Sequence, residues 1–74
     1  MSGKEKLLEQ TRRNSRNVAL HDFEALINAY GYIEEGAKHP KAIIGVHTLP
    51  YKKESRIKSC YVKGLLDMID ELPK

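Results

Sequence analysis

The chain has almost no cysteine: among its 74 residues Cys60 stands alone. A single thiol cannot form an internal disulfide, which fits a reducing compartment and predicts a cytoplasmic protein. No apolar run approaches the roughly 20 residues that span a membrane, and the opening MSGKEKLLEQ lacks the apolar core of a signal peptide. We therefore expect no membrane partner.

Several motifs of catalysis and ligand binding are also missing. The sequence contains no glycine-rich phosphate-binding loop and no serine in a nucleophile elbow. Its three histidines, His21, His39 and His47, do not combine with Cys60 in a metal-ligand spacing. We predict no metal site and no cofactor. No internal repeat divides the chain, and its length allows one small domain.

The charges are distributed unevenly along the chain, and one long stretch has no basic residue. The net charge is only +3, yet residues 17–37 hold four acidic and no basic groups, whereas residues 1–16 hold five basic and two acidic ones. Residues 38–63 hold seven basic groups against the single acidic Glu54. This block has the charge expected of a surface that binds a polyanion, although a solvated basic face is the plainer alternative.

Apolar spacing predicts two amphipathic helices. The first covers residues 20–30, and we expect Gly31 to end it as a left-handed cap. The second covers residues 59–72, with Ser59 as its N-cap and Pro73 after its end. Their apolar stripes consist of Leu20, Phe23, Leu26, Ile27 and Tyr30 in the first helix, and Val62, Leu65, Leu66, Ile69 and Leu72 in the second.

Three short strands are expected between these helices. The first follows Gly31 and closes at Gly36, and two apolar or β-branched pieces, 41–44 and 47–51, are joined by a hairpin turn at Gly45-Val46. Residues 52–58 read as a polar loop. The predicted fold is α+β with α-β-β-β-α order: a three-stranded antiparallel sheet with two helices on one face. Residues 1–16 precede it as an N-terminal extension or a short helix.

Four stretches of the sequence, in this order, resemble the HicA toxins of bacterial and archaeal toxin–antitoxin pairs. They are NSRNVALHDFEALINAYGY (14–32), GAKH (36–39), HTLPYKK (47–53) and IKSCYVKGLLDMIDEL (57–72). The first is similar to the family's asparagine-rich entry and first helix, and the second to its glycine-led turn ending in a histidine. The third is similar to its last strand and the basic pair after it, and the fourth to its final helix.

The resemblance implies a single HicA-like domain over residues 1–74 with a double-stranded-RNA-binding-like fold. It also implies a ribonuclease toxin that cleaves messenger RNA (an mRNA interferase), and a HicB-like antitoxin protein as its partner. His39 takes the position of the family's catalytic histidine. Two neighbours depart from the family pattern: Lys38 stands where serine is common, and Pro40 follows the histidine and fixes the local backbone.

RNA cleavage of this kind needs a group that moves a proton and cations that hold phosphate. Histidine suits the first task near neutral pH, which makes His39 the candidate general base or acid of a metal-independent endoribonuclease. Lysine and arginine suit the second. The candidate RNA-binding residues are Lys38, Lys41, Lys52, Lys53, Arg56 and Lys58. Tyr51 and Tyr61 flank them and either stack on bases or pack in the core.

The residues alone leave other interpretations open. His39 can be an ordinary exposed turn histidine, in which case the chain is a non-catalytic small RNA-binding module that keeps its lysines. A third interpretation is a protein-interaction domain whose basic face serves only a protein partner. His47 and His21 read as structural or surface residues.

Overall fold

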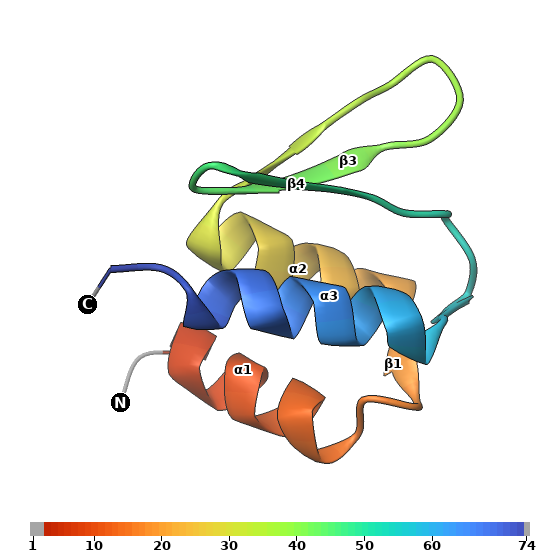
Figure 1. The fold of residues 1–74 in the computed structure, drawn as a ribbon. Helices are drawn as coiled ribbons and strands as arrows, with labels where there is room; N and C mark the ends of the chain where they lie inside the picture. The colour runs from red at the N-terminus through yellow and green to blue at the C-terminus, as the bar shows by residue number, and fades with distance from the viewer. Residues whose placement is uncertain (1–2, 74) are drawn as a thin grey trace.

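The structure is a computed structural model and describes residues 3–73, so residues 1, 2 and 74 of the expected domain lie outside the described residues. Three strands form one antiparallel sheet: β2 (Tyr32–Glu34), β3 (Lys41–Ile44) and β4 (His47–Pro50). The helices are α1 (Gly3–Arg13), α2 (Leu20–Tyr30) and α3 (Ser59–Asp70). In Figure 1, α2 and α3 lie side by side against one face of the sheet, and α1 packs beneath them on the side away from it.

This arrangement confirms the predicted α+β class, the α-β-β-β-α order after an N-terminal helix, and the placement of two helices on one sheet face. The strand order is β2-β3-β4, so the middle strand pairs on both sides. Ile43 of β3 lies opposite Tyr32 of β2 and Thr48 of β4. Gly45 has φ of 61° at the first central position of the β3–β4 turn, as the expected hairpin requires.

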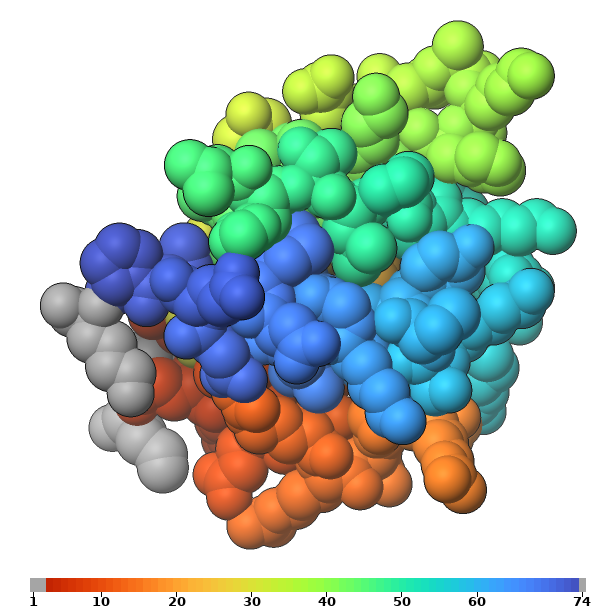
Figure 2. Space-filling view, viewed as in Figure 1, coloured from red at the N-terminus to blue at the C-terminus, as the bar shows by residue number. Residues whose placement is uncertain are grey.

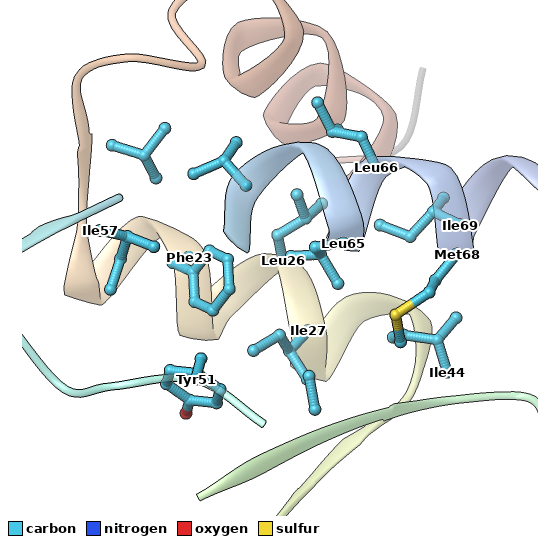
Figure 3. Packing of buried hydrophobic residues seen from close by; sticks show 13 residues of the cluster. Phe23, Leu26, Ile27, Ile44, Tyr51, Ile57, Leu65, Leu66, Met68 and Ile69 are labelled. Atoms are coloured by element: carbon cyan, nitrogen blue, oxygen red, sulfur yellow. The ribbon is translucent and has the colours of Figure 1, made fainter. Parts of the chain in front are cut away.

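The core lies between the sheet and the helices, where the two predicted apolar stripes meet. Its largest fully buried side chains are Tyr51, Phe23, Leu26, Ile27, Ile44, Leu65 and Val62. Figure 3 labels six of these residues, which converge from α2, α3, β3 and the segment after β4: Phe23, Leu26, Ile27, Ile44, Tyr51 and Leu65. The strand alternation explains the sheet's share, because Ala42 and Ile44 point inward whereas Lys41 is exposed.

Three predicted helix ends differ from the structure, and one of them is the end of α3, which lies at Asp70 and not at residue 72. Gly31 does end α2, but with φ of −163° and ψ of −133° it is not a left-handed cap. A glycine is needed there because a Cβ would fall on the carbonyl oxygen of Ile43. Ser59 is the first residue of α3 and not its N-cap; that position belongs to Lys58, which makes no side-chain capping bond.

The structure also contains a second, two-stranded sheet that was not predicted from the sequence. β1 (Val18–Ala19) precedes α2 and pairs antiparallel with β5 (Arg56–Ile57), inside the stretch 52–58 expected to be a polar loop. The pairing buries Val18 and Ile57 in the core. It fixes the segment that leads into α3. This segment carries two of the predicted cations, Arg56 and Lys58.

The N-terminal extension is the helix α1, tied to the rest of the fold at its C-terminal end. Both terminal nitrogens of Arg12 bind the carboxylate of Asp70 at the end of α3. Leu7 and Leu8 pack against the core from below. In the described range 3–73, no helix has the length and apolar character that crossing a membrane would require.

Candidate functional site

His39 lies in the loop between β2 and β3, which projects beyond the body of the molecule (Figure 2). The end of this loop is anchored, because Pro40 is buried and its carbonyl oxygen accepts a hydrogen bond of 3.1 Å from the Tyr51 amide. Its start folds back closely: a Cβ on Gly36 would collide with the carbonyl oxygen of His39. His39 is exposed, and the loop that carries it is anchored at its C-terminal end.

A pocket of about 350 Å³ lies beside this histidine. Its walls come from three separate segments: the β2–β3 loop, the end of β4 with the residues after it, and the first turn of α3. The lining residues are His39, Pro50, Tyr51, Lys52 and Tyr61. The fold thus brings the predicted catalytic histidine together with one of the predicted cations and with both tyrosines that the sequence had singled out.

Tyr51 forms the floor of this pocket and belongs to the core. Its side chain is only 1% exposed, and its ring meets Phe23 edge-on with 5.0 Å between the ring centroids. Its hydroxyl points away from the apolar cluster (Figure 3) and donates a hydrogen bond of 2.6 Å to Glu24 Oε2. Burial, and then the hydrogen bond to Glu24, raise the pKa of Tyr51 well above its ordinary value.

Because its pKa is raised, Tyr51 should affect the unfolding free energy of the chain at alkaline pH. The group is neutral in the folded chain, and its stabilising effect is fully present below the unfolded pKa of about 10 and is lost as the pH rises above that value. We expect the unfolding free energy to fall more steeply between pH 9 and 11.5 in the wild type than in Tyr51→Phe. Urea titrations across that range measure the difference, and equal slopes would contradict it.

The six predicted cations are all exposed, but they do not have equal surroundings. Lys53 Nζ lies 3.6 Å from Glu35 and 3.9 Å from Glu24, so its charge is shared with two carboxylates. Within residues 3–73, the other five make no ion pair: Lys38, Lys41, Lys52, Arg56 and Lys58. These five are the cations best placed to meet an external anion.

One of the free cations lines the pocket, and the other four lie on the segments before and after its lining residues in the chain. Lys38 and Lys41 flank His39 along the chain, on the loop and at the start of β3. Lys52 lines the pocket itself. Arg56 on β5 and Lys58 at the N-cap of α3 belong to the segment that the β1–β5 pairing holds in place. Lys52 is therefore the cation that the structure places at the pocket, and the other four are exposed charges on the segments next to its walls in the chain.

The other two histidines lie apart from this site. His47 stands at the opposite end of the β3–β4 hairpin, where its Nε2 lies 2.7 Å from Glu71 Oε2 beyond the end of α3. His21 is exposed in the first turn of α2. In the described part of the chain, no group of three or more histidine, cysteine, aspartate or glutamate side chains is placed to hold a metal ion.

One residue of the site was missed in the sequence, and the role of another was left open. Glu24 was not a candidate, although its position four residues after Leu20 places it beside the apolar stripe of the first helix. That position lets it reach Tyr51 and Lys53. Tyr61 was weighed but not assigned to the site; it precedes Val62 of the buried stripe, which leaves its ring half-exposed at the flank of α3.

Comparison of the chain with models of known families, with curated proteins and with solved structures finds no match. The features that bear on function are therefore the pocket and the exposed cations.

Proposed function

We propose that this chain is a HicA-like toxin: a metal-independent endoribonuclease that cleaves messenger RNA, with His39 as its general base or acid. The observation that carries the proposal is the pocket at which His39, Lys52 and Tyr61 meet. A proton-transfer group, a cation and an aromatic ring border one space open to solvent. The resemblance of residues 14–72 to the family adds to this geometry.

The chemistry follows from these side chains. His39 takes the proton of a ribose 2′-hydroxyl, and the freed oxygen attacks the adjacent phosphorus. The bond from phosphorus to the 5′-oxygen breaks and that oxygen takes a proton from water, which leaves a 2′,3′-cyclic phosphate on one product and a 5′-hydroxyl on the other. Lys52 stabilises the negative charge that develops on the phosphate oxygens.

The remaining free cations position the RNA. Lys38, Lys41, Arg56 and Lys58 provide sequence-independent phosphate contacts, which makes binding strongly dependent on salt. The same basic surface suits a HicB-like antitoxin of acidic character, which would block the pocket by covering it. Co-expression of such a protein should yield a complex in which RNA cleavage is suppressed.

Salt dependence gives a prediction for these cations. Lys58→Ala and Arg56→Ala should each lower the slope of log K against log salt by about 0.7 on single-stranded RNA, the amount for one lost phosphate contact. Lys53→Ala should change the slope less, because Glu24 and Glu35 already share its charge. Fluorescence anisotropy of labelled RNA between 50 and 300 mM KCl is the measurement.

A matched control for this series is Lys6→Ala, because Lys6 is exposed on α1, on the far side of the helical layer from the sheet. Its slope should equal that of the wild type. A Lys6→Ala slope reduced as much as that of Lys58→Ala would mean that RNA binds through overall charge and not at this surface.

One observation favours a second candidate, a non-catalytic RNA-binding module. In the described residues, the His39 side chain makes no hydrogen bond, whereas catalytic bases are commonly oriented by a third group. Such a module would keep the cations and the pocket without the chemistry.

Cleavage in the presence of a chelator decides between the two candidates. The purified chain is incubated with messenger RNA in EDTA, and the ends of the products are identified. The proposed function predicts 5′-hydroxyl and 2′,3′-cyclic phosphate ends. Salt-dependent binding of intact RNA, with no cleavage at any enzyme concentration, would establish the module instead.

A further inference from the structure

The pocket beside His39 differs from the surface that a nucleic-acid duplex needs. A protein can bind duplex RNA through phosphates and 2′-hydroxyls alone, by shape, with exposed cations on a convex surface. Here one cation, Lys52, lines a hollow whose walls also include two aromatic residues, a histidine and a proline. Its volume of about 350 Å³ is at the small end of ligand pockets, suited to one nucleotide and too small for a paired helix.

The two tyrosines of the pocket differ in how much of each ring a ligand can reach. Tyr51 is committed to the core, with its ring against Phe23 and its hydroxyl on Glu24. Tyr61 packs against the core with part of its ring and leaves the rest exposed. In the described part of the chain, its hydroxyl makes no hydrogen bond and its ring makes no aromatic contact. Tyr61 therefore has a ring surface available to a ligand.

The backbone at Tyr61 is held in place by hydrogen bonds. Tyr61 lies in the first turn of α3, where its amide donates a hydrogen bond of 3.0 Å to the Lys58 carbonyl oxygen. The β1–β5 pairing holds the segment before it. An aromatic ring that is rigidly placed and partly exposed loses little entropy on stacking, and base–aromatic stacking accepts any base because each has a π-face.

We infer that this pocket binds one unstacked nucleobase against Tyr61, so that the substrate is an unpaired stretch of RNA and the base belongs to the nucleotide on the 5′ side of the cleaved bond. The inference rests on the proposed function and specifies its substrate. With the base on Tyr61, the ribose of the same nucleotide lies toward His39 and its 3′-phosphate toward Lys52. A nucleotide held in a duplex cannot leave its stack to reach this position without the cost of unpairing.

The test uses one RNA strand whose cleavage position has been mapped with the wild type. Cleavage is compared on the free strand, on the strand annealed to its complement, and on a strand with an abasic ribonucleotide 5′ to the cleaved bond. The variants are Tyr61→Leu, which keeps apolar volume without a π-face, and Tyr61→Phe, which keeps the ring.

On the free strand, Tyr61→Leu should lower kcat/KM by about 10- to 100-fold, the loss expected for one base–aromatic stack, whereas Tyr61→Phe should stay within about 3-fold of the wild type. The abasic strand should lower the wild-type value by a similar factor and should cause little further loss in Tyr61→Leu. The annealed strand should be cut at least 10-fold more slowly than the free strand.

The inference is overturned if Tyr61→Leu cleaves the free strand like the wild type, or if the duplex is cut as fast as the single strand. Absence of cleavage by the wild type would reject the proposed function, and anisotropy then tests the pocket separately, with a single-stranded RNA and a fully abasic strand of the same length. Tighter binding of the free strand than of the abasic strand, lost in Tyr61→Leu, would uphold the base site. Equal binding of both strands would reject it.

Discussion

Replacing His39 by alanine should lower the rate of RNA cleavage by about 10²- to 10⁴-fold, the range that general acid–base catalysis contributes. Among the described residues that line the pocket, His39 is the only histidine, and a charged lysine cannot take a proton from a 2′-hydroxyl at neutral pH. The rate is measured under single-turnover conditions with excess protein, so that weakened binding does not imitate lost chemistry.

The loss must be separated from unfolding. His39 is exposed, and its side chain makes no hydrogen bond in the described residues, so His39→Ala should change the unfolding free energy by no more than about 0.5 kcal/mol. His47→Ala is the matched control. It removes the contact to Glu71, which is worth at most about 1 kcal/mol at the surface, and should leave cleavage unchanged. Equal losses in both variants would contradict the assignment of His39.

The largest effect on stability is expected for Tyr51→Ala. The side chain is fully buried, and removal of a large buried aromatic ring typically costs about 3–5 kcal/mol. A core in a chain of this size supplies only about 3–5 kcal/mol in total. Tyr51→Ala should therefore be largely unfolded at 25 °C, as far-UV circular dichroism and urea titration would show.

Tyr51→Phe tests the reason for that loss. It keeps the edge-on contact with Phe23 and removes only the hydrogen bond to Glu24, which should cost about 1 kcal/mol. The variant should fold and should cleave RNA at nearly the wild-type rate, since the hydroxyl is bound to Glu24 and has no role in the proposed chemistry. If Tyr51→Ala remained folded, the ring could not be the floor on which the pocket is built.

The predictable part of the fold is the part governed by long periodic patterns. The stripes of the helices 20–30 and 59–72 extend over three turns each, so the sequence predicted both helices and the core that they form. The hairpin was predictable because Gly45 marks its turn. The β1–β5 pairing was not, because two residues per strand carry no alternation that a reader could recognise.

Only those parts of the candidate site whose residues are neighbours in the chain could be predicted from the sequence. Lys38, His39 and Lys41 adjoin one another in the chain, so their grouping needed no structure. The meeting of His39 with Tyr61 depends on how the β2–β3 loop approaches the start of α3, which no local pattern encodes. The pairing of Lys53 with Glu24 and Glu35 likewise arises from three separate elements, and it distinguishes this lysine from its neighbour Lys52.

The most direct test of the account compares wild type and His39→Ala on two strands of one sequence, a single-stranded RNA and its all-2′-deoxy counterpart, in EDTA. The chemistry requires both a 2′-hydroxyl and His39. The wild type should therefore cut the RNA to products with 5′-hydroxyl ends, and the other three combinations should give no product on the same timescale. Cleavage of the deoxy strand at a comparable rate, or of the RNA by His39→Ala at the wild-type rate, would contradict the account.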